Sequence, residues 1–288
     1  MTAKILAALP LVEQMKKDLK SRCETLKSRG TTPSMCVVLV GDNPASLSYI
    51  RNKKKICEEV GAQFSLLQLP SNILERDFLD KIERLNHDTK VHGIIIQLPV
   101  SEHLKKLNLS NLVMPTKDID GFHGVNTQQI YTGSTDLKLM IPCTPKGIIY
   151  LLKFYGVEIA GKHAVVIGRS LIVGKPLSML MSNLNATVTL AHSQTQNLEE
   201  ITKTADILIS AIGKVHFIQK KHLNPAKKTI VIDVGMNTSN GKLTGDAAPD
   251  LIQVAGGITP VPGGVGPMTV VSLIENLITA TENQIKGS

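Results

Sequence analysis

Tryptophan is absent from this sequence, and aromatic residues make up only 3% of its 288 residues. Proteins that bind single-stranded nucleic acid stack bases on aromatic side chains, and the one strong basic cluster here is Lys53 to Lys55. We therefore expect no nucleic-acid partner. The formal net charge of +8 then favours small phosphorylated or carboxylated ligands.

Cysteines and long apolar runs are also scarce. The four cysteines are dispersed and form no C-x-x-C pair, which argues against a disulfide framework and against a zinc site: Cys23, Cys36, Cys57 and Cys143. We expect no metal and a reducing, cytoplasmic location. No segment approaches the about 18 uninterrupted apolar residues of a membrane span. The run 5–12 is interrupted by Pro10 and makes a poor signal peptide.

The length leaves room for two domains, and the first half alternates strand and helix patterns. Strands are expected at 36–40, 64–69 and 93–99, and helices at 11–29, 44–60 and 74–85. This alternation predicts right-handed crossovers and a parallel sheet.

The helix at 44–60 carries a lysine in an unusual place. Asn43 can cap its N-terminus and Pro44 suits its first turn. At about 100° per residue, Lys53 falls in the middle of the stripe formed by Ser46, Tyr49, Ile50, Ile56, Cys57 and Val60. Such a lysine is paired with another group, extends along apolar surface to water, or sits in a cavity where desolvation lowers its pKa, as in acid–base catalysts. The stripe by itself favours the extended alternative.

Two polar features follow in the first half. Gln97 stands at the tip of an apolar strand, where it either meets the helix that carries Lys53 or merely caps the strand. The segment 114–126 is typical of a loop, and its Asp118-Ile119-Asp120-Gly121 is similar to a calcium loop without the later acidic ligand. One aspartate could accept adjacent N–H donors of a ligand, or form an ordinary Asx-turn.

A boundary is expected at 121–141, followed by a connecting helix that opens at Thr144. Cys143, next to that helix, is either a reactive thiolate or a structural thiol. The structural alternative is favoured because no histidine is near it in the sequence.

The second half begins with a strand, a glycine turn from Gly168 to Gly174, and a helix at 177–184. This order is typical of a Rossmann-type domain that holds a pyrophosphate, although the turn is not G-x-G-x-x-G. Further strands are expected at 187–190, 206–210 and 229–234. The strand 187–190 leads to Ser193 instead of an acidic residue, and Arg169 stands in the turn, so NADP is preferred over NAD.

The chain closes with a loop rich in glycine and proline at 256–269, where a ligand could approach the backbone closely, and then a helix through about Thr281.

Six motifs occur in order over nearly the whole chain: Tyr49-x-x-x-Lys53, Gln97-Leu98-Pro99, Lys117-Asp118-Ile119-Asp120-Gly121, Pro142-Cys143-Thr144-Pro145, Gly168-Arg169-Ser170-x-x-Val173-Gly174-x-Pro176 and Pro260-Val261-Pro262-Gly263-Gly264-Val265-Gly266-Pro267-Met268-Thr269. Together they resemble the bifunctional methylenetetrahydrofolate dehydrogenase/cyclohydrolases. Gly124 departs from the proline that bacterial members often have, which affects only local loop shape.

The resemblance implies two parallel-sheet α/β domains with a cleft between them. Residues 1–120 with about 268–288 would form the folate-binding catalytic domain, and 140–267 the Rossmann-type NADP-binding domain. The implied chemistry belongs to one-carbon metabolism and purine biosynthesis: NADP-dependent oxidation of 5,10-methylenetetrahydrofolate to the 5,10-methenyl compound, then hydrolysis to 10-formyltetrahydrofolate. Family members are homodimers. The alternatives are a monofunctional dehydrogenase and a non-enzymatic nucleotide-binding regulator.

The resemblance also implies residue roles. Lys53 matches the catalytic lysine, Tyr49 the ring that stacks on folate, Gln97 the partner of the lysine, and Asp120 the carboxylate that holds the pterin. Further folate-lining positions are Ile96, Leu98, Pro262, Gly263, Gly264, Val265 and Gly266. NADP contacts are assigned to Gly168, Arg169, Ser170, Gly174, Ser193 and Met236.

Overall fold

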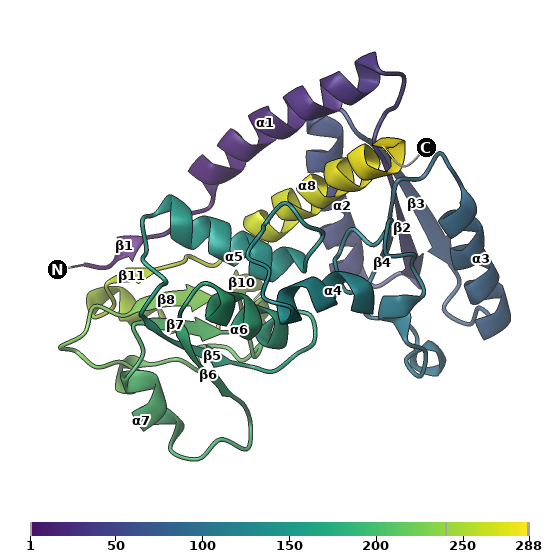
Figure 1. Cartoon of the computed structure of the whole chain (residues 1–288). Helices are drawn as coiled ribbons and strands as arrows, with labels where there is room; N and C mark the ends of the chain where they lie inside the picture. The colour runs from purple at the N-terminus through teal and green to yellow at the C-terminus, as the bar shows by residue number, and fades with distance from the viewer. Residues whose placement is uncertain (1, 240, 287–288) are drawn as a thin grey trace. The chain divides into compact units, whose positions relative to one another are not determined.

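The computed structural model describes residues 2–239 and 241–286, and its larger sheet has six parallel strands in the order β1-β11-β8-β7-β5-β6. The strands are β1 (Lys4–Ile5), β5 (His163–Ile167), β6 (Thr187–Ala191), β7 (Ile207–Ser210), β8 (Ile230–Asp233) and β11 (Gly257–Ile258). The short, buried apolar runs of β5, β7 and β8 suit the centre of a parallel sheet that is covered on both faces. Figure 1 shows the helices that connect these strands.

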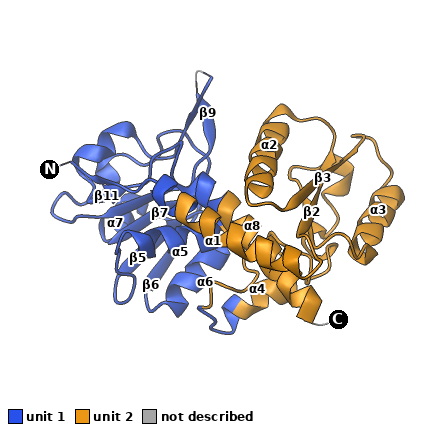
Figure 2. Ribbon diagram, turned by 90° about the horizontal axis from the view of Figure 1, so that it is seen from above, with its two compact units in different colours: residues 1–12, 130–135, 144–269 blue, residues 13–129, 136–143, 270–288 orange. Residues whose placement is uncertain are grey.

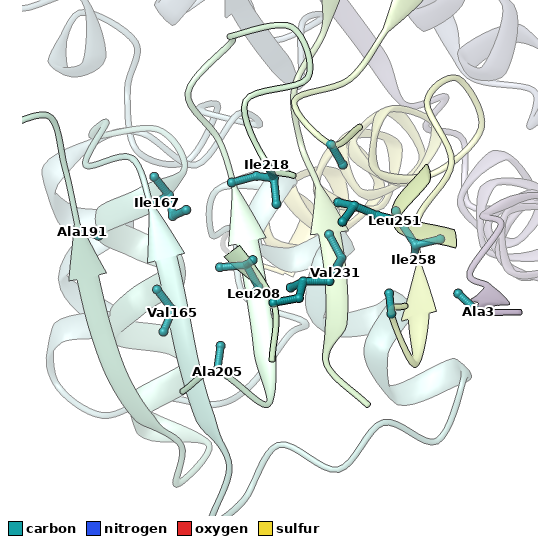
Figure 3. Packing of buried hydrophobic residues seen from close by; sticks show 13 residues of the cluster. Ala3, Val165, Ile167, Ala191, Ala205, Leu208, Ile218, Val231, Leu251 and Ile258 are labelled. Carbon is teal, nitrogen blue, oxygen red and sulfur yellow. The ribbon is translucent and has the colours of Figure 1, made fainter. Parts of the chain in front are cut away.

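Apolar side chains of neighbouring strands pack into one core on this sheet (Figure 3). Val165 of β5, Leu208 of β7 and Val231 of β8 are all fully buried there. Burying a side chain of this size contributes about 1.5–3 kcal/mol relative to leaving it in water. This core stabilises the sheet. Because the strands are parallel, their carboxyl ends all lie at the same edge of it.

The smaller sheet has three parallel strands in the order β3-β2-β4, with β2 (Ser34–Val40), β3 (Gln63–Leu69) and β4 (Gly93–Ile96). In its register, Val37 of β2 lies opposite Leu66 of β3 and Ile95 of β4. Helices α2 (Pro44–Glu59) and α3 (Glu75–His87) lie on opposite faces of this sheet in Figures 1 and 2. Phe78 and Ile82 of α3 join the core over β2.

The chain forms two compact units, coloured blue and orange in Figure 2. Unit 1 contains residues 1–12, 130–135 and 144–269, and unit 2 contains residues 13–129, 136–143 and 270–288. The first twelve residues, which we expected in the first domain, thus lie in unit 1, because β1 pairs with β11. The predicted fold class of two parallel-sheet α/β domains is confirmed.

The remaining helices are α1 (Leu9–Ser28), α4 (Gly124–Tyr131), α5 (Cys143–Phe154), α6 (Gly174–Asn183), α7 (Leu198–Lys203) and α8 (Val265–Lys286). Short 3₁₀ helices occur at η1 (Glu102–Leu104), η2 (Leu109–Asn111), η3 (Lys220–His222) and η4 (Pro249–Gln253), and a hairpin is formed by β9 (Asn237–Ser239) and β10 (Lys242–Thr244). Within residues 2–239 and 241–286, no helix combines the length and the apolar character that crossing a membrane requires.

Helices α4 and α8 are among the segments that differ from the sequence-based expectation. Helix α4 lies in the expected boundary at 121–141, where the sequence has no apolar stripe, and its Asn126 is buried because its amide binds Asp118. Helix α8 begins at Val265, so the last part of the expected loop at 256–269 is already helical.

Candidate active site

Helix α2 starts as the sequence predicts. The Asn43 side-chain oxygen accepts hydrogen bonds from the backbone N–H groups of Ala45, at 2.9 Å, and Ser46, at 3.2 Å. Pro44 occupies the first helical position. The cap satisfies the free N–H groups at the start of the helix, and Lys53 lies on the buried side of the helix together with Ile50 and Cys57.

Lys53 does not extend to water. The residue is only 6% exposed to solvent, and its Nζ donates a hydrogen bond of 3.1 Å to Oε1 of Gln97. The same Nζ lies 5.8 Å from the centre of the Tyr49 ring, within range of a cation–π interaction. The extended conformation that the stripe alone favoured is therefore wrong, and the ammonium is instead buried and paired with the side-chain amide of Gln97.

Gln97 is held in one orientation at the carboxyl end of β4. Its backbone N–H donates to the Val38 carbonyl at 2.9 Å, and its side-chain Nε2 donates to the Leu98 carbonyl at 2.9 Å. Because the amide nitrogen is used in this way, the amide oxygen is turned toward Lys53. Ile96 and Leu98 flank it, half-buried and exposed respectively, and the Leu98–Pro99 peptide bond is cis.

The two aspartates of the following loop differ in function. Asp118 accepts hydrogen bonds from the backbone N–H groups of Gly121, at 3.1 Å, and His123, at 2.7 Å, so it closes an Asx-type turn. No described group donates a hydrogen bond to the carboxylate of Asp120. Burial raises the pKa of Asp120, the positive charge of Lys53 opposes this shift, and the charge of Asp118 adds to it. Of the two carboxylates, Asp120 is thus the one that accepts no hydrogen bond among the described residues.

Tyr49 shares these surroundings. Burial raises the pKa of its hydroxyl, and the negative charge of Asp120 adds to the shift. Tyr49, Lys53, Gln97 and Asp120 all lie in unit 2, so this unit brings together an aromatic ring, an ammonium, an amide and a carboxylate.

Gly121 fixes the position of Asp120, which suggests a first test. Its φ is +76°, and a Cβ at this position would meet the carbonyl carbon of Ile141 at 2.3 Å. We expect Gly121→Ala to lower the free energy of unfolding by about 2–5 kcal/mol, the sum of left-handed backbone strain and overpacking. Urea unfolding measures this. The matched control is Gly30→Ala, with φ of +85° and no heavy atom within 4 Å of the added Cβ.

The control should show only the backbone cost, about 1–2 kcal/mol. Equal losses in the two variants would contradict the close approach at Gly121.

Cys143 is a structural thiol. Its Sγ donates to the Ile119 carbonyl at 3.3 Å and receives a hydrogen bond from the side chain of Asn276 at 3.4 Å. All four cysteines are buried, and none of them forms a disulfide. Among residues 2–239 and 241–286, no three His, Cys, Asp or Glu side chains gather as a metal site would require.

The glycine turn after β5 is closed so tightly that two of its positions admit only glycine. Gly168 has φ of +114°, and a Cβ there would lie 2.5 Å from the Ala211 carbonyl oxygen. A Cβ on Gly174 would lie 1.8 Å from the Gly168 carbonyl oxygen. The Ser170 hydroxyl accepts from the backbone N–H of Val173 at 3.2 Å and leads the chain into α6. This backbone suits a pyrophosphate at the helix N-terminus.

The other predicted cofactor residues follow strands of the same sheet. Ser193 comes shortly after β6 and is exposed, while Met236 follows β8 and is 47% exposed. Arg169, after β5, is also exposed. Because the strands are parallel, all three residues stand at the carboxyl edge of the sheet, where dinucleotides bind. The residues of this edge therefore fit a dinucleotide.

The predicted folate-lining segment from Pro262 to Gly266 lies in unit 1, and the structure does not place it in the unit that holds Lys53. The Val261–Pro262 peptide bond is cis, and Gly263 has φ of +105°. Val265 and Gly266 belong to the first turn of α8 and not to a loop. A Cβ on Gly264 would meet the Pro260 carbonyl oxygen at 2.6 Å, so this turn also needs glycine.

Sequence reasoning missed two buried aspartates at the carboxyl edge of the larger sheet, Asp233 and Asp246. Asp233 was passed over as the end of an apolar strand, and Asp246 has no periodic pattern around it. A signal did exist, since each aspartate has a glycine close by in the sequence, Gly235 and Gly245.

Comparisons with known proteins agree with this arrangement. Residues 6–120 match the family model described as tetrahydrofolate dehydrogenase/cyclohydrolase, catalytic domain, and residues 142–285 match the one described as tetrahydrofolate dehydrogenase/cyclohydrolase, NAD(P)-binding domain. The bifunctional protein FolD of Brevibacillus brevis is 46% identical over 288 residues, which cover 99% of this chain and 100% of that protein.

Two solved structures extend the similarity to the fold. The bifunctional methylenetetrahydrofolate dehydrogenase/cyclohydrolase FolD of Campylobacter jejuni is 39% identical, with a TM-score of 0.93 over 98% of this chain and 99% of that one. The Trypanosoma brucei enzyme, solved with NADP cofactor and inhibitor, is 31% identical, with a TM-score of 0.92 over 99% of each chain. With its buried lysine, its glycine turn and both family domains in order, the chain belongs to the tetrahydrofolate dehydrogenase/cyclohydrolase family of bifunctional enzymes.

Proposed function

We propose that this enzyme oxidises 5,10-methylenetetrahydrofolate to 5,10-methenyltetrahydrofolate with NADP and then hydrolyses the product to 10-formyltetrahydrofolate. The observation that carries the proposal is the buried Lys53, bound to Gln97 and close to the Tyr49 ring. Burying a charge costs free energy, so an apolar residue would serve better if this position only had to be packed. The buried ammonium of Lys53 is therefore best explained by a role in the chemistry.

The pterin is the part of the substrate that unit 2 can recognise. It presents an amino group beside a ring N–H, and Asp120 can accept both in bidentate fashion. The half-buried Tyr49 offers a flat ring against which a pterin can stack. Gln97 and Lys53 then lie beside the ring, where the one-carbon bridge has to be for hydrolysis.

Hydrolysis needs a proton to be moved. The methenyl compound is a cation, so the water that attacks its one-carbon bridge gives up both protons as the formyl group forms. One proton passes to the nitrogen that leaves the bridge, and the other is released to solvent. Lys53 can relay the proton that passes to the nitrogen, and its hydrogen bond to Gln97 keeps Nζ in place during the transfer. No metal is needed for these steps.

The dinucleotide would be held by unit 1, and when bound it supplies the hydride acceptor of the oxidation. The glycine turn and the N-terminus of α6 suit the pyrophosphate. Arg169 and Ser193 suit a ribose 2′-phosphate, because one offers a guanidinium, the other offers a hydroxyl, and residues 192–198 directly after β6 include no acidic residue. Oxidation further requires the nicotinamide and the one-carbon bridge to meet at near-contact distance.

A coupled assay tests the proposal. Methylenetetrahydrofolate and NADP should yield NADPH, and the methenyl absorbance should then disappear as hydrolysis proceeds. NADPH formation with stable methenyl absorbance would indicate the monofunctional dehydrogenase. A chain that binds NADP without turnover would indicate the nucleotide-binding regulator.

We also propose a homodimer and a cytoplasmic location. The larger sheet ends at β6, whose outer edge faces no other strand among the described residues, and such an edge is suited to pairing with a second copy. Four buried cysteines that form no disulfide suit a reducing compartment. Light scattering after size-exclusion chromatography should give twice the mass of 31.2 kDa.

Folate binding should depend on pH through Asp120. Because burial raises the pKa of this carboxyl above the ordinary 3.8, protonation removes the acceptor for the pterin at a higher pH than for an exposed aspartate. Below that pKa, the dissociation constant for folic acid should rise about tenfold per pH unit. Isothermal titration over a pH series measures this.

The charge of Lys53 lowers the pKa of Asp120, so Lys53→Met should raise that pKa further. The loss of binding should then begin at a higher pH in the variant than in the wild type. A shift toward lower pH would contradict the pairing of these two charges.

A further inference from the structure

We propose that Asp246 is a positioning residue that orders two loops of unit 1 for the cofactor. The inference rests on the proposed binding of NADP at this edge of the sheet. Asp246 is fully buried. Its Oδ2 accepts hydrogen bonds from the Ser210 hydroxyl at 2.9 Å, the Ile212 N–H at 3.0 Å and the Gly213 N–H at 3.3 Å. Its Oδ1 accepts from the Lys214 N–H at 2.8 Å and the Asn237 amide at 3.1 Å.

These donors lie in or directly beside the loops that follow two neighbouring strands. Ser210 is the last residue of β7, and residues 211–214 follow it directly. Asn237 is the first residue of β9 and directly follows residues 234–236, which connect β8 to β9. The first loop also supports the glycine turn, since a Cβ on Gly168 would lie 2.5 Å from the Ala211 carbonyl oxygen. The second carries Met236, one of the proposed cofactor contacts. One carboxylate therefore connects both loops at the edge where the dinucleotide binds.

A second aspartate fixes the first. Asp233, at the end of β8, accepts from the backbone N–H groups of Gly235 at 2.9 Å, Asp246 at 2.9 Å and Ala247 at 2.8 Å. The approach is so close that a Cβ on Gly235 would lie 2.2 Å from Oδ1 of Asp246, and one on Gly245 would lie 1.8 Å from Oδ2 of Asp233. The glycines are required by this packing, which closes the base of the β9–β10 hairpin.

The carboxylate cannot be replaced by an amide without loss. Both oxygens of Asp246 act only as acceptors in these bonds, whereas asparagine has one oxygen and an NH₂ group that donates. In Asp246→Asn, the NH₂ group would face the N–H donors of one loop, whichever way the amide turned. That loop would lose its anchor and would have to become ordered when NADP binds, which weakens binding.

The test compares the two activities of one protein. We expect Asp246→Asn to raise the KM for NADP about tenfold, the effect of losing one or two charge-assisted hydrogen bonds, with kcat less affected. Hydrolysis of methenyltetrahydrofolate needs no cofactor and should stay within about twofold of wild type. A merely structural defect would not separate the two activities in this way.

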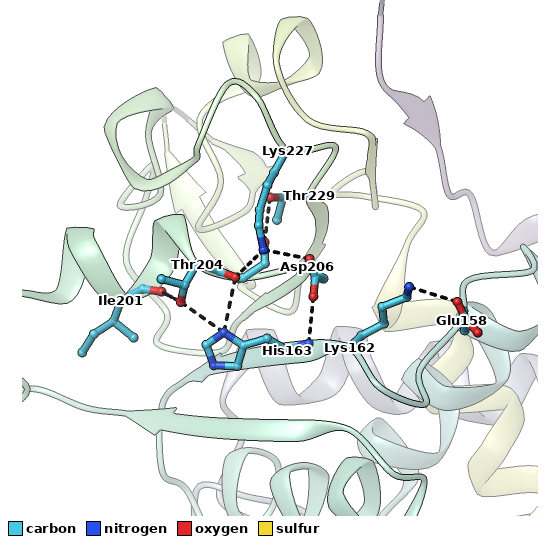
Figure 4. Close-up of polar contacts among 9 residues, drawn as sticks. Glu158, Lys162, His163, Ile201, Thr204, Asp206, Lys227 and Thr229 are labelled. Carbon is cyan, nitrogen blue, oxygen red and sulfur yellow. Dashed lines mark hydrogen bonds and ion pairs between the residues drawn. The ribbon is translucent and has the colours of Figure 1, made fainter.

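Asp206→Asn is the matched control. Asp206 lies before β7, at the opposite edge of the same sheet, where it accepts from the His163 N–H at 2.9 Å and from Lys227 Nζ at 2.9 Å (Figure 4). The control makes the same chemical change and also removes hydrogen bonds between segments of unit 1. It should leave the KM for NADP unchanged.

A second, milder variant keeps the inference testable if Asp246→Asn does not fold. Asn237→Ala removes only the amide that reaches Asp246, and it should raise the KM for NADP about twofold to fivefold. An unchanged KM in both Asp246→Asn and Asn237→Ala would overturn the inference, as would an equal loss of both activities in Asn237→Ala. Failure of the proposed function is distinct, because the wild-type protein would then lack NADP-dependent oxidation.

Discussion

Lys53→Met is expected to abolish the hydrolysis of methenyltetrahydrofolate, with a loss of about 10²–10⁴ in kcat, the usual contribution of a positioned acid–base group. Methionine keeps an unbranched apolar stem, so the buried face of α2 should stay packed. It removes the ammonium that donates to Gln97 at 3.1 Å and lies near the Tyr49 ring. The decay of methenyl absorbance with purified variant measures the loss.

Lys55→Met is the matched control on the same helix. The Lys55 side chain is 75% exposed and forms an ion pair of 3.9 Å with Glu59, the kind of surface contact that contributes at most about 1 kcal/mol. This variant should hydrolyse at the wild-type rate. Wild-type hydrolysis by Lys53→Met would refute the assignment of Lys53 as the group that moves the proton.

NADP should be preferred over NAD, with a ratio of kcat/KM of about 10²–10⁴. The expected ratio follows from two hydrogen bonds to a charged phosphate, each contributing about 1.5–3 kcal/mol. Arg169 supplies the charge and Ser193 a hydroxyl, both exposed at the carboxyl edge of the larger sheet. The initial rates of reduction of the two cofactors give the ratio directly, and a preference for NAD would refute the 2′-phosphate interpretation.

Arg169→Ala should lower kcat/KM for NADP and leave the value for NAD within about twofold, because NAD has no 2′-phosphate for the guanidinium to bind. Lys203→Ala is the control for a change in net charge. Lys203 ends α7 in the same unit, where it pairs with Glu200 at 2.7 Å. The Lys203→Ala variant should leave the ratio of kcat/KM for NADP and NAD unchanged.

Local patterns sufficed for the main elements of both units. The apolar runs gave strands close to their observed bounds, and α2 begins at Pro44 with Asn43 as its cap, as predicted. Helix α4 and the short strands β1 and β11 were not predicted. A strand of two residues has no period to detect, and β1 exists because Lys4 pairs with Gly257, far away in the chain.

In the candidate site, too, local patterns predicted some features and contacts between distant residues decided the others. Periodicity placed Lys53 on the packed face of α2 but favoured an extended side chain. The hydrogen bond to Gln97, 44 residues later, reverses that preference. Likewise, sequence alone could not tell which aspartate of the loop closes the turn, whereas the bonds to Asp118 leave Asp120 without a donor among the described residues.

The sequence by itself determined the fold class, the order of the two domains and the family, because these depend on local periodicity and on motifs that are contiguous in the chain. Tertiary structure alone decided that Lys53 is buried against Gln97 and that Asp246 connects the loops after β7 and β8. Such contacts join side chains that are distant in sequence. Their geometry is set by the packing of whole strands, which no local pattern encodes.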